Sequence, residues 1–116
     1  MKREMDLIRE ILRTVEERPE KAKHDVSIPG RSDEEMRLHL HLMKDAGLID
    51  GLTIGAQFVA VGRLTNAGYD FLDASRKDTI WQKAKDMAIS KTGGLSIAAL
   101  TEALKVVVKA AITGTA

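Results

Sequence analysis

Residues 51–64 limit the fold of this chain most strongly, because they interrupt a sequence whose other segments have the spacing of helices. The segment holds one charged residue, Arg63, and three glycines among β-forming side chains. Leu52–Ile54 and Gln57–Val61 predict the strands of a β-hairpin, with Gly55-Ala56 as its turn. Alternate side chains of the second strand should share a face. One face would hold Phe58, Ala60, Gly62 and Leu64, and the other Val59, Val61 and Arg63.

The start of the chain predicts an amphipathic helix from about Lys2 to Arg18. Its apolar residues recur at three- and four-residue spacing, and they are Leu7, Ile8, Ile11, Leu12 and Val15. Pro19 should end the helix, because the residue before a proline is driven out of helical geometry. Residues 19–31 then form a connector, in which Asp25–Ile28 is a candidate short strand.

A second helix is expected from Ser32 to about Ala46. Ser32 and Glu35 have the spacing of a capping box, in which each side chain accepts a hydrogen bond from the other residue's backbone N–H. Gly47 suits a left-handed C-terminal cap, and Leu48 should fold back onto the helix.

Three further helices are expected after the hairpin. Thr65 can cap a helix over Asn66–Ser75, which Gly68 should weaken by roughly 1 kcal/mol relative to alanine. Asp78 or Thr79 can cap a helix that ends near Lys91. Ser96 opens a last helix of about 17 residues, so the C-terminal region is expected to be all helical.

The resulting order is helix, short strand, helix, β-hairpin and three helices. This order predicts an α+β fold of the winged-helix type, in which the hairpin is the wing. In such domains the helix before the wing lies in the DNA major groove. The connector before Ser32 is too short for the extra helix of a full helix-turn-helix, so we expect an abbreviated form.

Composition excludes several classes of protein. The 116 residues include no cysteine, which excludes disulfides and cysteine-ligated zinc. Only four residues are aromatic, so the core must be aliphatic. Hydrophobic residues make up 44% and charged residues 30%, as in a soluble globular domain. The first residues lack a secretory pattern, and no stretch is apolar enough to span a bilayer, so a cytoplasmic location is expected.

The sequence has no recognisable catalytic or metal-binding motif. His39 and His41 are two positions apart on a predicted helix and point in different directions, so they cannot chelate one metal. The glycine-rich segments lack the lysine of a phosphate loop, and no serine has the context of a nucleophile. We therefore expect no enzymatic activity, no cofactor and no small-molecule ligand.

Three segments carry a resemblance to a known family. Met1–Arg9, His39–Ile49 and Arg63–Asp73, the last continuing through Trp81, resemble the bacterial and prophage family called domain of unknown function 2513. Asn66 stands where the family usually has Trp, and Tyr69 where it has His. The resemblance covers nearly the whole chain. It implies a winged-helix-like fold and an association with phages, and it brings no catalytic motif.

Within this fold, double-stranded DNA is the first partner to consider for a small regulatory protein. The candidate contacts are the basic or imidazole side chains around the second helix and the wing: Arg31, Arg37, His41, Lys44 and Arg63. Arg37 and Lys44 would lie on the exposed side of the second helix, and Arg63 would anchor the wing to a phosphate.

The distribution of charge favours a rival function. The whole chain has a net charge of +1, but residues 32–50 have two basic and five acidic residues, a net charge of −3. The predicted groove helix is thus the most acidic part of the chain, whereas DNA affinity depends on neutralising phosphates. The alternative is a protein–protein interaction module on a winged-helix frame without DNA binding.

The last helix is apolar around nearly its whole circumference, more than packing on one side requires. A surplus apolar face usually meets another chain, so we expect a homo-oligomer, most simply a dimer. The expected interface residues are Ile97, Leu100, Leu104, Val107, Val108 and Ala111. The expected organisation is a winged-helix-like domain over residues 1–92 and an oligomerisation helix over residues 93–116.

Overall fold

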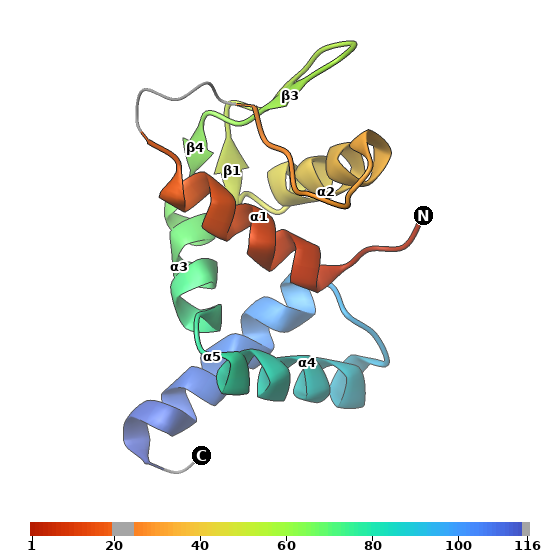
Figure 1. Cartoon of the computed structure of the whole chain (residues 1–116). Helices are drawn as coiled ribbons and strands as arrows, with labels where there is room; N and C mark the ends of the chain where they lie inside the picture. The colour runs from red at the N-terminus through yellow and green to blue at the C-terminus, as the bar shows by residue number, and fades with distance from the viewer. Residues whose placement is uncertain (20–24, 115–116) are drawn as a thin grey trace. The chain divides into compact units, whose positions relative to one another are not determined.

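A computed structural model describes residues 1–19 and 25–114 of the chain. Its contacts group the chain into two compact units, Met1–Tyr69 and Asp70–Ala116. Figure 1 follows the elements along the chain by colour. The expected boundary between residues 92 and 93 stays a prediction, and so does the part of the expected connector that covers residues 20–24, which lies outside the described residues.

The first unit begins with α1 (Met5–Glu17), which has a fully apolar buried side. The predicted periodic residues are all buried, and Met5 is buried with them. The helix ends where Arg18 turns to extended backbone before Pro19, as the sequence predicts.

The second helix, α2 (Asp33–Asp45), confirms both of its predicted ends. The Ser32 hydroxyl accepts from the Glu35 N–H at 3.1 Å, and the Ser32 N–H donates to the Glu35 carboxylate at 3.4 Å. At the other end Gly47 has a φ of +75°, and the Leu48 N–H donates to the Met43 carbonyl at 2.9 Å. This pairing satisfies a carbonyl that the last turn would leave open.

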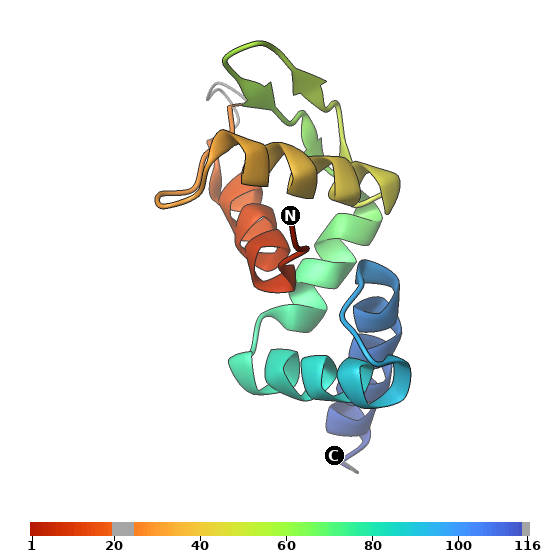
Figure 2. The same ribbon diagram turned by 90° about the vertical axis from the view of Figure 1, so that its right-hand side faces the viewer.

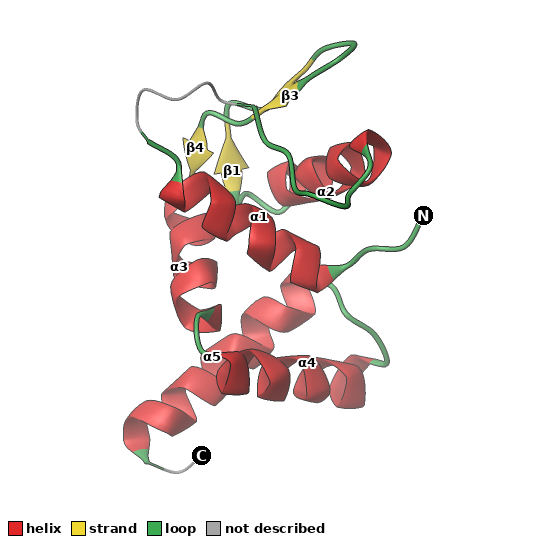
Figure 3. Cartoon of the chain, in the orientation of Figure 1, coloured by secondary structure: helices red, strands yellow, loops and turns green. Residues whose placement is uncertain are grey.

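The hairpin forms as two short antiparallel ladders with a common register (Figure 3). At its base β1 (Ile49–Asp50) pairs with β4 (Arg63–Leu64), and toward its tip β2 (Thr53–Ile54) pairs with β3 (Val59–Ala60). The break falls at Gly51, whose φ is +72°, and Gly62. The Gly62 N–H is shared between the carbonyls of Asp50 and Gly51, at 3.0 and 3.1 Å.

Both predicted faces of the second strand contribute buried side chains. Val59 and Val61 are buried from one face, and Leu64, from the other, is buried at the base of the hairpin. The candidate strand near residue 25 is reduced to one bridge between Asp25 and Ala60, supported by a 3.1 Å bond from the Val26 N–H to the Val59 carbonyl.

Helix α3 (Asn66–Ser75) begins at Thr65, as predicted. The Thr65 hydroxyl accepts from the Gly68 N–H at 3.1 Å and donates to the Gly47 carbonyl at 2.5 Å. Close packing explains why a glycine stands at position 68, and helix propensity does not reveal this. A Cβ atom at this position would lie 2.1 Å from the Leu48 carbonyl oxygen.

The second unit contains α4 (Asp78–Thr92) and α5 (Ile97–Thr113), which pack against each other (Figure 2). Trp81 is buried and meets Phe71 edge-on with 6.0 Å between ring centroids. The Ser96 hydroxyl caps α5 by accepting from the Ala99 N–H at 3.0 Å. The cap predicted for α4 is wrong. Lys77 is the N-cap, because the Trp81 N–H already bonds to its carbonyl at 2.9 Å.

The described residues thus form an α+β protein with five helices and a small hairpin. The buried hydrophobic side chains are aliphatic or methionine apart from Phe71 and Trp81, and His39 and Ser75 are buried polar residues. None of the helices in residues 1–19 and 25–114 combines the length and hydropathy needed to cross a membrane.

Candidate interaction site

Arg37 connects α2 to the tip of the hairpin. Its Nη2 donates to the carbonyls of Gly55 and Ala56, both at 3.1 Å. The Nε of Arg37 is buried and has no partner among the described residues. The side chain predicted to read DNA therefore joins the helix to the hairpin within one chain. Nη2 carries two N–H groups, so this one nitrogen can donate to both carbonyls.

The tip that Arg37 holds is apolar. The Phe58 ring lies over Gly55, where a Cβ atom would come within 2.1 Å of the ring. The Gly55 N–H donates to the Phe58 carbonyl at 2.9 Å and closes the turn. Even so, Phe58 is 47% exposed and Ile54 is 37% exposed. The sequence predicted a two-residue turn at Gly55-Ala56, whereas the loop between β2 and β3 covers residues 55–58. The sequence also did not single out these two side chains as surface residues.

Arg31 lies between two carboxylates at the start of α2. Its Nη1 is 2.5 Å from a Glu4 carboxylate oxygen and 3.0 Å from one of Glu35. The hydrogen bond from Arg31, followed by that from the Ser32 N–H, lowers the pKa of Glu35 below its ordinary value of 4.5. The same two carboxylates raise the pKa of Arg31. Two acids thus surround this predicted DNA contact.

His39 ties the start of α1 to α2. The ring is fully buried. Its Nε2 accepts from the Glu4 N–H at 2.9 Å, and its Nδ1 lies 2.7 Å from the Glu35 carbonyl oxygen. A neutral ring protonated on Nδ1 satisfies both contacts. With both nitrogens engaged, this histidine has a structural role.

The other nominated side chains are on the surface. Arg63 is 3.3 Å from the Asp50 carboxylate and donates to the Leu64 carbonyl at 3.1 Å, at the base of the hairpin. His41 and Lys44 are exposed on α2. Their spacing puts them on the same side of α2 as Arg37, one and two turns further along. Arg31 and Arg63 lie beyond this row, on other elements.

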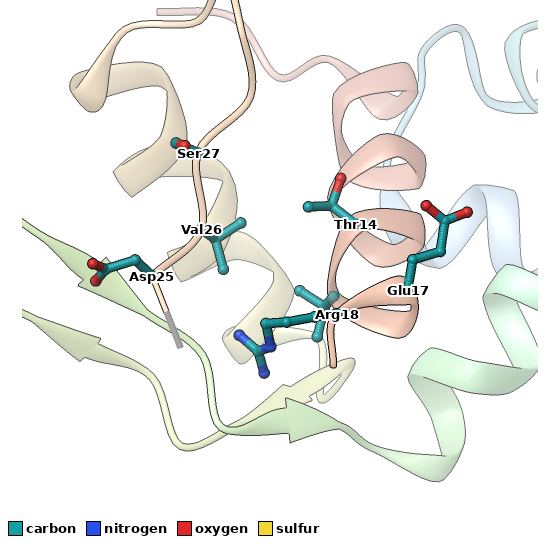
Figure 4. Close-up of a pocket in the computed structure, with 7 residues that line it drawn as sticks. Thr14, Glu17, Arg18, Asp25, Val26 and Ser27 are labelled. Carbon is teal, nitrogen blue, oxygen red and sulfur yellow. The ribbon is translucent and has the colours of Figure 1, made fainter. Parts of the chain in front are cut away.

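A pocket of about 370 Å³ opens where α1 ends (Figure 4). It is lined by Thr14, Val15, Glu17, Arg18, Asp25, Val26 and Ser27. The Arg18 guanidinium, at one side of this pocket, donates to the Val61 and Gly62 carbonyls at 2.9 and 3.1 Å. Sequence reasoning did not nominate Arg18, because nothing in the residues around it distinguishes it from a solvated arginine.

The predicted interface residues of α5 fall into three groups. Leu100, Leu104 and Val107 are buried within the chain's own fold. Ile97 and Val108 are partly buried, and Ala111 is exposed. The two large exposed apolar residues of this helix, Val106 at 54% and Ile112 at 81%, were not nominated.

These elements define a class of small α+β protein in which one helix and a hairpin are joined by an arginine. The chain belongs to the family described as hypothetical protein (DUF2513), which it matches over residues 2–94. This finding confirms the resemblance seen in the sequence. The chain is also 31% identical, over 114 residues, to an uncharacterized protein of Haemophilus influenzae. That alignment covers 93% of this chain and 96% of the relative. No solved structure matches the chain.

Proposed function

We propose that the first unit is a protein–protein interaction module on a winged-helix frame, with the hairpin tip as its contact point. The observation that carries this proposal is the pair of bonds from Arg37 to the Gly55 and Ala56 carbonyls. These bonds engage the guanidinium of Arg37, a cation expected on the exposed side of α2, within the chain itself. They also hold an apolar tip in one position on the surface.

The charges near the tip support a protein partner. Arg31 and Arg63 each face carboxylates, so their charges are offset within the chain. Asp33 and Glu34, one turn before Arg37, are exposed. Phosphate binding depends on uncompensated cations, and this surface offers few.

The tip itself has the character of an interface anchor. Phe58 is a large side chain fixed at its backbone and still about half exposed. Aromatic residues held in a fixed position lose little entropy on binding and often dominate protein interfaces. Ile54 pairs with Val59, one position beyond the Gly55–Phe58 pair, so its exposed side chain lies on the other face of the hairpin. A partner with an apolar pocket and a basic edge would complement Phe58 and the acids of α2.

Affinity purification from the native host with matched baits tests this proposal. Phe58→Ser should lose a specific protein that the wild type captures. Tyr69→Ser changes a side chain of similar exposure, 44%, away from the tip, and should retain it. Two results would count against the tip as the contact point. Both variants could capture the same proteins, or neither the variants nor the wild type could capture a specific protein.

DNA binding is the second candidate, and one observation favours it. The order of α1, the bridge at Asp25, α2 and the hairpin is that of winged-helix DNA readers. The exposed His41 and Lys44 would then be the main contacts on α2. Replacing Arg37 would also remove its bonds to the hairpin tip, so the single change Lys44→Ala is the more informative test of DNA contact. Under this candidate it should weaken binding and reduce the salt dependence.

A further inference from the structure

A groove with an apolar floor lies between α4 and α5, within the second unit. It has a volume of about 330 Å³, and its lining residues are Lys83, Asp86, Met87, Val106, Val107 and Ala110. Val106 is more than half exposed at this groove. Valine is apolar, so its exposure beside Met87 and Ala110 leaves an apolar surface that no other described residue covers.

We propose that a second copy of this chain covers the groove, with the two α5 helices antiparallel and Val106 at the two-fold axis. This inference does not depend on the proposed function of the first unit. It replaces the interface expected from the sequence, because the leucines of that set, Leu100 and Leu104, are buried within the chain.

The charges beside Val106 select a second copy as the occupant. Glu102 lies one turn before Val106 and Lys109 one turn after it, on the same side of α5. In an antiparallel pair centred on Val106, Glu102 meets the partner's Lys109, and the symmetry repeats this contact. Glu102 already has an ion pair to Lys105 at 3.2 Å, but both side chains are about 70% exposed and free to adjust. The surface is thus complementary to itself.

Light scattering across a wide range of protein concentration is the first test. The wild type should approach twice the 12.7 kDa of one chain as its concentration rises. Val106→Glu should remain monomeric, because it would bury a carboxylate at the axis. Ile89→Glu is the matched control: Ile89 is 49% exposed on α4 but does not line the groove, so this variant should still dimerise.

Charge reversal provides the second test and does not depend on apolar contacts. Glu102→Lys and Lys109→Glu should each weaken the dimer by roughly tenfold, since each puts like charges in contact twice. The double reversal should restore affinity close to that of the wild type. Circular dichroism would check that each variant is folded.

Three outcomes would overturn this proposal. The wild type could stay monomeric at every concentration, which would leave the groove to a different protein. Val106→Glu could dimerise as well as Ile89→Glu, which would move the interface elsewhere. The double reversal could be as weak as either single change, which would exclude the antiparallel pairing.

Discussion

Two arginines hold the hairpin through its backbone carbonyls. Arg18 donates to Val61 and Gly62 near the base, and Arg37 donates to Gly55 and Ala56 at the tip. Hydrogen bonds from a charged donor are stronger than neutral ones, and the acceptors here belong to a short, broken ladder. The hydrogen bonds from these two side chains therefore supply part of the stabilisation that a longer pair of strands would give the hairpin.

Arg37→Ala should lower the free energy of unfolding by about 1–2 kcal/mol, because two charged hydrogen bonds are lost at a partly exposed position. Urea denaturation would measure this loss, and hydrogen exchange should show faster exchange at the hairpin tip. Lys44→Ala, an exposed change on the same helix, should stay within about 0.5 kcal/mol of wild type. Equal stability of the two variants would contradict the role assigned to Arg37.

Glu35 makes stability depend on acid pH. Arg31 lowers the pKa of this carboxyl in the folded chain below its ordinary value of 4.5. As the pH falls below 4.5, the carboxyl is protonated in the unfolded chain before it is protonated in the folded chain. The stabilisation from the Arg31–Glu35 pair is therefore complete above this pH and is lost as the pH falls to the pKa of the folded chain.

Glu35→Gln removes this titration, and its urea midpoint should therefore fall less steeply than that of the wild type between about pH 5 and pH 3. Arg31→Met should flatten the slope in the same way, and the double variant should add little. An unchanged slope in both single variants would disprove the coupling between Arg31 and Glu35.

At the scale of elements, the caps made the helices predictable. The Ser32–Glu35 box, the left-handed Gly47 and the Ser96 cap are local signals, and the structure confirms each of them. The gap between the two ladders of the hairpin was not predictable, because it falls where Gly51 and Gly62 approach each other closely. A Cβ atom on Gly51 would lie 3.0 Å from the Gly62 Cα, and no local pattern reveals such a contact.

Gly68→Ala tests a similar contact in α3. Propensity alone predicts a gain of about 1 kcal/mol for alanine in a helix. The new Cβ would instead meet the Leu48 carbonyl, so we expect a loss of about 2–3 kcal/mol from overpacking. Gly94→Ala, where nothing lies within 4 Å, is the control and should be nearly neutral. Thermal unfolding would compare the two, and a stabilised Gly68→Ala variant would contradict the packing.

At the scale of the whole molecule, the net charge of +1 hides an uneven distribution. Counting charges was enough to question DNA binding, because the acids of α2 are visible in the sequence. It could not show that Arg31, Arg37 and Arg63 are engaged within the chain, since their partners come from the N-cap of α1, the hairpin tip and β1. The exposed Phe58 and Val106 were also missed, because exposure depends on packing between elements that are separate in the sequence.

The most direct test of this account is a fluorescence anisotropy titration of a random-sequence DNA duplex with the full chain, at low and at moderate salt. We predict no rise in anisotropy even at low salt, where phosphate contacts are strongest. Micromolar binding that weakens steeply with salt and is reduced by Lys44→Ala would contradict the interaction-module function and establish α2 as a nucleic-acid contact.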